Sequence, residues 1–182
     1  DATSRRRRCR SEYRFASRPD LALDPVVQRN IAALAAYDWT FDLQVFTSQM
    51  ADAARLAEAC PKVTFILQHA GMLEDLSPAG RVAWRSGMQR LAGLPNVVSK
   101  LSGLGTFLHR NDAAHIADVV RDTLSIFGPN RYMFGSNFPI EKLWTGYGDL
   151  IAAYRAALAH LSPQDRAAVF HDTAARVYRL SN

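Results

Sequence analysis

Four polar side chains stand near the ends of apolar runs, and their chemical types could bind or activate a small molecule. They are Gln44, His69, Lys100 and Asn137. An imidazole can ligate a metal, accept a proton or polarise a carbonyl group. A side-chain amide can orient water or a substrate oxygen, although it cannot serve as a general base, and a lysine can bind an anionic group.

Three of these residues also have a purely structural interpretation. His69 could be a partly buried histidine bonded to a neighbouring backbone group, although the small residues Ala70 and Gly71 that follow it leave room for a ligand. Asn137 could form an Asx-type turn at the end of its run. Lys100 could extend its charge to the rim of the fold.

The elements that must position these side chains alternate regularly. The apolar runs cover residues 39–46, 63–71, 96–104 and 131–139. Helical segments lie around and between them, and the residues that favour helix starts are Asp24-Pro25, Ser48, Ser77-Pro78, Asn111 and Ser162-Pro163. Apolar strands that alternate with helices indicate an α/β protein with a parallel sheet covered on both faces.

Two architectures fit this order of elements. A doubly wound sheet would carry a glycine-rich turn after its first strand, but the first run is followed by Thr47-Ser48-Gln49. A (β/α)8 barrel instead gathers polar residues at the carboxyl ends of its strands, as observed here. A complete barrel needs about 250 residues, so the pattern predicts half of a TIM barrel with four parallel strands.

Alternation along the strands assigns further side chains to faces of the sheet. Asp42 shares a face with Gln44 and joins the candidates, because a carboxylate inside a strand is costly unless it is paired. The same alternation predicts that His69 lies with Phe65 and Leu67 in the barrel interior.

Charge divides the chain into two parts. Residues 1–18 hold seven arginines and two acidic residues, which accounts for the formal net charge of +5, so residues 19–182 are balanced. We expect a mobile basic arm over 1–18 and a folded domain over 19–182. A neutral domain argues against a nucleic-acid partner, and no apolar run approaches the ~18 residues of a membrane span. Two cysteines and no targeting segment predict a cytoplasmic protein.

Five ordered segments of the chain resemble the second half of the amidohydrolase-related family, which includes sugar and dicarboxylate lactonases. The segments are FDLQVF, FILQHAGM, LPNVVSKLSGLG, RYMFGSNFP and AAVFHDTAARVYRL, and the likeness covers roughly residues 18–180. The resemblance implies the C-terminal half of a (β/α)8 TIM barrel. It also implies hydrolysis of lactones or related bonds, with decarboxylation in more distant relatives and a divalent metal, often zinc, in many members.

The resemblance also implies roles for individual residues. His69 matches a histidine that contacts metal or substrate, Lys100 matches a strand lysine, and Gln44 lies where a strand faces the substrate. Asn137 occupies a place where many members have an aspartate that activates water. The His-x-His metal pair of the family has no counterpart here, so the chain does not supply a complete zinc ligand set.

These observations lead to a hydrolase as the first hypothesis. Water would attack the carbonyl of a lactone or of a similar ester or amide bond in a small molecule. His69 and Asn137 would be catalytic, with His69 also the candidate metal ligand, and Gln44, Lys100 and Asp42 would bind substrate. The alternative is a non-catalytic remnant or interaction module of the same fold, whose open strand edges pair with another chain, including a second copy.

Overall fold

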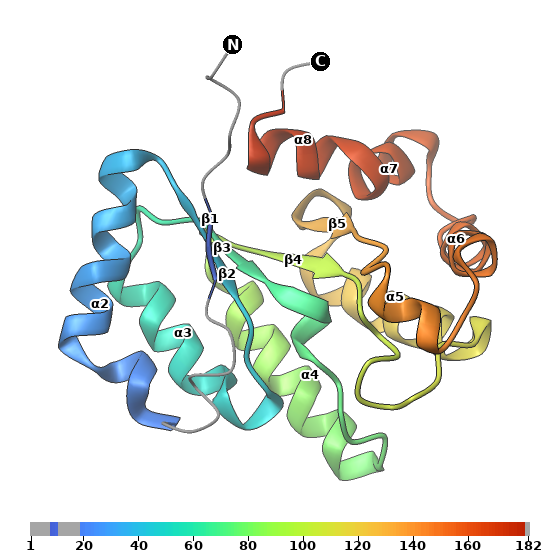
Figure 1. Cartoon of the computed structure of the whole chain (residues 1–182), viewed down its shortest axis with the longest axis horizontal. Helices are drawn as coiled ribbons and strands as arrows, with labels where there is room; N and C mark the ends of the chain where they lie inside the picture. Colours follow the sequence, from blue (N-terminus) through green and yellow to red (C-terminus); the bar gives the residue numbers. More distant parts are fainter. Residues whose placement is uncertain (1–7, 11–18, 181–182) are drawn as a thin grey trace.

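Five parallel strands form one sheet in the computed structural model, which describes residues 8–10 and 19–180. The strands are β1 (Arg8–Arg10), β2 (Thr40–Leu43), β3 (Phe65–Leu67), β4 (Val97–Leu101) and β5 (Tyr132–Phe134), and they lie side by side in sequence order (Figure 1). β2 to β5 fall within the four predicted runs, each shorter than its run, so the predicted order of parallel strands is confirmed. Sequential order is the arrangement of consecutive strands in a barrel.

β1 is the strand that the sequence pattern did not predict. Its backbone pairs with β2 in parallel, with Arg8 opposite Thr40 and Arg10 opposite Asp42. Arg8–Arg10 therefore form part of the sheet instead of a mobile arm. The other residues of the predicted arm, 1–7 and 11–18, lie outside the described residues.

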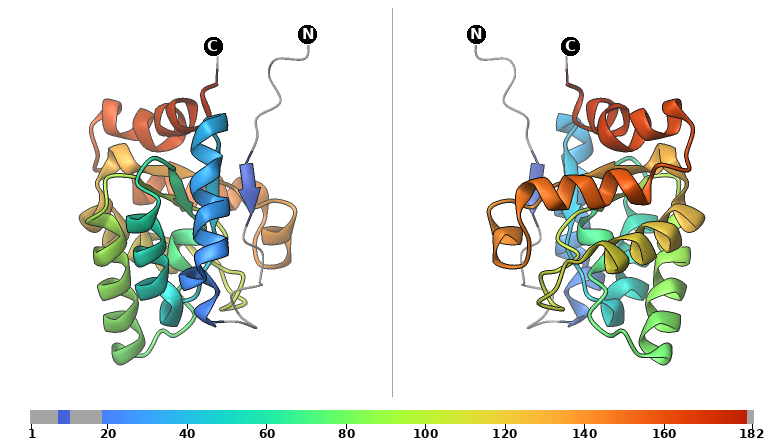
Figure 2. Two further views of the ribbon diagram at one scale, coloured as in Figure 1. Left: turned by 90° about the vertical axis from the view of Figure 1, so that its left-hand side faces the viewer. Right: turned by 90° about the vertical axis from the view of Figure 1, so that its right-hand side faces the viewer.

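The helices pack side by side around the sheet. They are α2 (Pro25–Ala32), α3 (Met50–Ala59), α4 (Pro78–Ala92), α5 (Ala113–Phe127), α6 (Tyr147–Ala157), α7 (Pro163–Ala167) and α8 (Thr173–Tyr178). Each helix from α2 to α6 contacts the next. The segment from α7 to α8 packs on β5, and both helices lie on one side of the molecule in the two views of Figure 2. Within the described residues, no helix has the length and apolar character that crossing a bilayer requires.

Short 3₁₀ and π segments complete the described part of the chain. The 3₁₀ segments are η1 (Pro19–Leu23), η2 (Ala33–Tyr37), η3 (Thr47–Gln49), η4 (Gln68–Gly71), η5 (Pro129–Arg131) and η6 (Ile140–Leu143), and η7 (Ala168–Asp172) is a π-helical turn between α7 and α8. η4 directly follows β3, and η6 begins a few residues after β5. The polar residues His69 and Asn137, which were singled out from the sequence, lie in η4 and between β5 and η6, respectively.

Three helices begin at the capping residues that the sequence indicates. The Asp24 carboxylate accepts a hydrogen bond from the backbone N–H of Val26 at 2.7 Å. Ser77 Oγ accepts from the N–H of Gly80 at 3.1 Å, and Ser162 Oγ accepts from the third residue of its helix. These side chains satisfy backbone donors that have no partner within the helix.

Two predicted helix starts are wrong. Ser48 lies inside η3, and α3 starts only at Met50. The cap of α5 is Asp112, whose carboxylate accepts from the N–H of His115 at 3.0 Å, whereas the amide of Asn111 donates to a different, buried side chain. Asn111 is therefore engaged in a tertiary contact and does not cap its helix.

The sequence predicts that Phe65 and Leu67 of β3 face the barrel interior with His69, but in the structure these two side chains face the other way. Phe65 and Leu67 are fully buried in the main hydrophobic core together with helix residues such as Trp84, so they face the helices. Ile66 packs on the other face, in a small cluster with Val98, Met133 and Val177 from α8. His69 therefore does not share a face with Phe65 and Leu67, and the predicted grouping of the three is wrong. The reason is that the chain leaves the extended conformation after Leu67, so the alternation of the strand does not continue to His69.

Candidate functional site

A cavity of about 340 Å³ lies at the carboxyl ends of the strands. All five residues singled out from the sequence line it together with five others: Asp42, Gln44, Gln68, His69, Lys100, Ser102, Phe134, Gly135, Asn137 and Tyr178. Parallel strands bring their carboxyl ends to one edge of the sheet, which explains why residues from successive strands meet here. The predicted convergence of the strand ends is therefore confirmed, while the roles of these residues stay predictions.

A left-handed backbone turn directs His69 into this cavity. His69 has φ 56° and Ala70 has φ 48°, values that non-glycine residues rarely adopt. The Nδ1 atom of His69 lies 3.0 Å from Ser102 Oγ, at hydrogen-bond distance. Gly103 lies against the same ring. The contact is so close that a Cβ atom at position 103 would overlap His69 Nδ1.

Lys100 lines the cavity, and its ammonium group has partners there. Its Nζ donates to Gln68 Oε1 at 3.1 Å and lies 5.5 Å from the centroid of the Tyr178 ring. Gln68 in turn donates from Nε2 to the carbonyl oxygen of Ile66 at 3.0 Å, which orients its own carbonyl toward the lysine. The arrangement adds a positive charge to a cavity that also holds the Asp42 carboxylate and several neutral polar groups, and the ammonium can bind an oxygen acceptor of a ligand.

Asn137 is held by a buried acidic residue that the sequence reasoning missed. Glu141, in η6, is fully buried, and its Oε1 accepts from Asn137 Nδ2 at 3.3 Å and from Thr106 Oγ1 at 3.0 Å. Its Oε2 accepts from Asn111 Nδ2 at 2.5 Å. An acidic residue four positions after Asn137 gives no sequence signal of burial, because acidic residues are normally exposed.

The sequence analysis also missed three further lining residues, two of which could have been found from their positions in the chain. Gln68 directly precedes His69, and Ser102 follows Lys100 by two positions in an extended segment, so both could have been found by reading on along the chain. Tyr178 lies in α8, and only the packing of that helix on β5 brings it to the cavity.

The described residues of the cavity do not form a complete zinc site. His69 is the one histidine in its lining, and no group of three or more histidine, cysteine, aspartate and glutamate residues with metal-binding geometry occurs among the described residues. Structural and catalytic zinc sites use at least three protein ligands of these types. We therefore derive the chemistry of this cavity from its own side chains.

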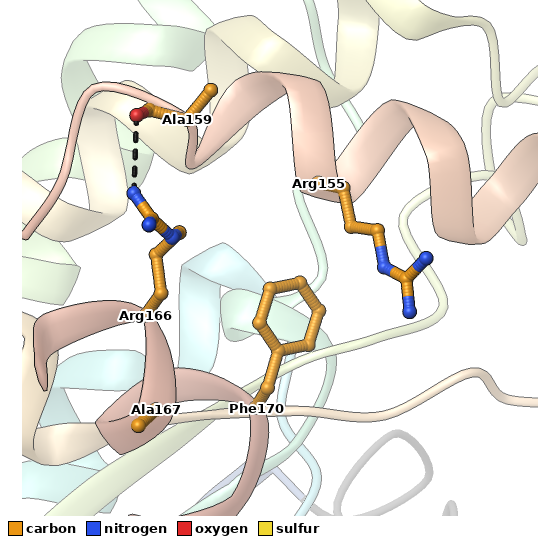
Figure 3. Close-up of a pocket in the computed structure, with 5 residues that line it drawn as sticks. All are labelled: Arg155, Ala159, Arg166, Ala167 and Phe170. Atoms are coloured by element: carbon orange, nitrogen blue, oxygen red, sulfur yellow. Dashed lines mark hydrogen bonds between the residues drawn. The ribbon is translucent and has the colours of Figure 1, made fainter. Parts of the chain in front are cut away.

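A second cavity, of about 520 Å³, lies between α6 and the α7–η7 segment and shares no residue with the first. Its lining is largely apolar, and Arg155 and Arg166 approach it from either side of Phe170 (Figure 3). The guanidinium group of Arg166 is committed to the carbonyl oxygens of Ala159, at 3.2 Å, and Leu161. The arginine thus joins two helical segments, and of these two cavities the first holds the histidine, lysine and asparagine singled out from the sequence.

Comparison with known proteins finds one family model and several relatives. A family model described as Amidohydrolase matches residues 1–180. An L-fucono-1,5-lactonase from Burkholderia multivorans is 36% identical over 163 residues, which are 84% of this chain and 55% of the relative. A second L-fucono-1,5-lactonase, from Burkholderia ambifaria, is 32% identical over 166 residues, which are 86% of this chain and 56% of the relative.

A solved structure agrees with these sequence matches. The crystal structure of an amidohydrolase from Burkholderia multivorans with bound zinc superimposes with a TM-score of 0.83 at 31% identity, over 89% of this chain and 60% of that one. The present chain spans about half the length of the curated relatives it matches. The fold predicted from the sequence, part of a (β/α)8 barrel, is confirmed.

Proposed function

Because the chain belongs to the amidohydrolase family, we propose that it carries the substrate-binding part of a hydrolase that opens a lactone, or a similar ester or amide bond, in a small polar molecule. One observation carries the proposal: His69, Lys100 and Asn137, from three successive strand ends, line a single cavity. The two relatives named as L-fucono-1,5-lactonases support a sugar lactone as the substrate class.

The lining side chains have different roles in the proposed hydrolysis of a carbonyl compound. The His69 tautomer that fits this role accepts at Nδ1 from the Ser102 hydroxyl, carries its proton on Nε2 and polarises the substrate carbonyl with it. The Lys100 ammonium stabilises negative charge that develops on the carbonyl oxygen as water attacks. Asn137 orients the attacking water or the leaving oxygen, and Gln44 and Asp42 accept hydrogen bonds from substrate hydroxyl groups.

We propose a bound metal only for the whole protein and not for the residues described here alone. The Burkholderia multivorans amidohydrolase binds zinc, and His69 is the imidazole that this cavity offers to such an ion. The remaining ligands would come from residues that the structure does not describe or from the rest of the barrel, so no step above passes through a metal.

Hydrolysis of L-fucono-1,5-lactone tests the proposal directly. The 182-residue chain is assayed alone and together with the part of the Burkholderia multivorans lactonase that it does not match, with a pH indicator reporting ring opening. We expect hydrolysis above background in the complemented preparation. Lys100→Met should lower kcat/KM by about 100-fold, because it removes the charge that stabilises the oxyanion.

Arg155→Met is the matched control, because it removes one positive charge at the second cavity. Its activity should stay within about twofold of the unmodified chain. Absence of hydrolysis in both preparations would overturn the proposal, and binding of the complementary segment without hydrolysis would support an interaction module instead. Equal losses in the two variants would contradict the role given to Lys100.

A further inference from the structure

Glu141 joins two of the loops that surround the cavity. Its three donors come from the segment after β4, which supplies Thr106 and Asn111, and from the segment after β5, which supplies Asn137. The backbone N–H of Glu141 also donates to the carbonyl oxygen of Asn137 at 3.2 Å. Glu141 is therefore tied to Asn137 through both backbone and side chain.

This network decides which end of the Asn137 amide faces a ligand. The Nδ2 atom points to Glu141 Oε1 at 3.3 Å and to Thr106 Oγ1 at 3.5 Å. A carboxylate accepts hydrogen bonds and does not donate them, so the reversed amide would place two acceptor oxygens against each other. Since Asn137 lines the cavity, its Oδ1 is the polar atom left for a ligand, where it accepts from water or a hydroxyl group.

Because of the same contact, an amide at position 137 is more favourable than a carboxylate. An aspartate there would bring a second carboxylate within about 3.3 Å of Glu141, a side chain with no solvent-exposed surface. Two carboxylates at that distance repel each other, and one of them takes up a proton at a pH where an isolated carboxyl group is ionised.

Two histidines lie on segments next to this network: His115, whose ring bonds to the carbonyl oxygen of Leu104, and His109, whose ring stacks on Trp144. Both are present in the unmodified chain and in every variant. No hydrogen bond joins either of them to Glu141 in the part of the chain that the structure describes.

Among the described residues, the hydrogen-bond partners of Glu141 are all neutral. Burial raises the pKa of Tyr154 in α6, and the negative charge of Glu141 adds to the effect, so this phenol stays neutral between pH 5 and pH 8. The difference in stability between a variant at position 137 and the unmodified chain over that range therefore reports on the carboxyl pair, because both proteins contain the same histidines.

We propose that Glu141 is a positioning residue of the cavity, which fixes the Asn137 amide with its carbonyl oxygen toward the ligand and requires an amide at position 137. The inference rests on the proposed function only in giving that oxygen water or substrate to hold. The pairing of the two side chains is a property of the folded chain and is measurable without substrate.

A four-member stability cycle tests this pairing. The apparent unfolding midpoint is measured at one heating rate from pH 5 to pH 8 for the 182-residue chain, Asn137→Asp, Glu141→Gln and the double variant. Asn137→Asp should lower the midpoint by about 5 °C at pH 8, and the loss should shrink toward pH 5 as the carboxyl pair takes up a proton. In this variant the paired carboxyl has a raised pKa in the folded state, so the stability of the variant relative to the unmodified chain falls as pH rises.

The double variant provides the rescue that a merely structural role would not predict. The amide introduced by Glu141→Gln can donate from Nε2 to the carboxylate introduced by Asn137→Asp, while its Oε1 still accepts from Asn111 Nδ2. The double variant should therefore unfold within about 2 °C of Glu141→Gln at every pH, with no extra pH dependence. Midpoints in which the two single losses simply add would overturn the proposal, as would an Asn137→Asp variant as stable as the unmodified chain at pH 8.

The amide itself supplies a second measurement. In protein labelled with ¹⁵N at asparagine, the side-chain NH₂ signals of Asn137, identified by their loss in Asn137→Asp, should exchange slowly with solvent. Exchange should become at least about tenfold faster in Glu141→Ala, because the carboxylate that accepts from this amide is gone. Unchanged exchange would contradict the proposal. Neither measurement uses a lactone, so a failure of the hydrolysis assay leaves both interpretable.

Discussion

His69 reaches the cavity through a left-handed backbone conformation and not through the alternation of its strand. A non-glycine residue in this region costs roughly 1 kcal/mol or more, and His69, Ala70 and Met72 all adopt it. The hydrogen bond to Ser102 and the packing of Gly103 against the ring hold the side chain in place. Strained residues that the surrounding structure keeps in position are typical of functional sites.

A second histidine, His115, is buried away from the cavity lining and is expected to couple the stability of the fold to pH. His115 is 4% exposed, and its Nε2 lies 3.2 Å from the carbonyl oxygen of Leu104. Burial lowers the pKa of His115 below its usual value near 6.5, and the nearby positive charge of Arg110 adds to the effect, while the Leu104 carbonyl and Asp112 oppose it.

The lowered pKa of His115 makes stability depend on pH in one direction. The unfolded chain takes up a proton on this histidine at higher pH than the folded chain does, so the free energy of unfolding should fall as pH drops below about 6.5. His115→Gln should remove this part of the slope. Urea unfolding of both proteins between pH 5 and pH 8 measures it, and parallel curves would show that His115 does not contribute.

Among the loops and turns, the segment that follows β4 requires glycine at one position. Gly103 has φ 62°, and a Cβ there would overlap the His69 ring, whereas Gly128 at the end of α5 has φ 73° and open space around it. Both positions disfavour a side chain for backbone reasons, but only Gly103 also contacts the ring of a residue that lines the cavity.

Alanine at these two glycines separates backbone strain from contact with His69. Gly128→Ala and Gly103→Ala should each cost about 1–3 kcal/mol of unfolding free energy, because alanine is strained at a positive φ. Only Gly103→Ala should also displace the His69 ring. Chemical denaturation gives both costs, and the ¹⁵N-labelled histidine signal of His69 should shift in Gly103→Ala alone. An unshifted His69 signal in that variant would contradict this explanation.

The edges of the whole sheet differ from the sequence expectation. Since four parallel strands cannot close into a barrel, the sequence predicts unpaired backbone and apolar surface at the runs WTFDLQVF and RYMFGS. The apolar part of this expectation is wrong for Phe41, Leu43, Tyr132 and Met133, which are each at most 4% exposed. β1 covers one edge of β2, and Val177 of α8 packs over the inner face of the sheet. What remains open among the described strands is backbone, because β1 and β5 each pair on one side only.

Open strand edges predict self-association of the chain. Unpaired backbone at β5 favours edge-to-edge pairing, and the charges of residues 19–182 balance and offer little repulsion. The other outer strand, β1, carries two arginines, which oppose pairing at that edge. Light scattering after size exclusion should show dimers or larger species whose share grows with concentration. Adding the unmatched segment of the Burkholderia multivorans lactonase should reduce that share. A concentration-independent monomer that unfolds in one cooperative step would contradict the prediction.

The order of strands and helices, and the edge at which the polar residues meet, could be predicted from residue types and spacing. Those features follow from local patterns: apolar runs, capping side chains such as Asp24 and Ser77, and the rule that parallel strands end at one edge. This was enough to place Gln44, His69 and Asn137 near one another.

The way these residues are held depends on tertiary packing. Ser102 lies 33 positions from His69, and Glu141 lies 30 positions from Asn111, so no local pattern relates them. The strand Arg8–Arg10 consists of residues with little apolar character and owes its conformation to pairing with β2. The turn of His69 out of strand alternation likewise depends on contacts with the next strand. Such choices rest on the packing of distant segments, which residue type and spacing do not encode.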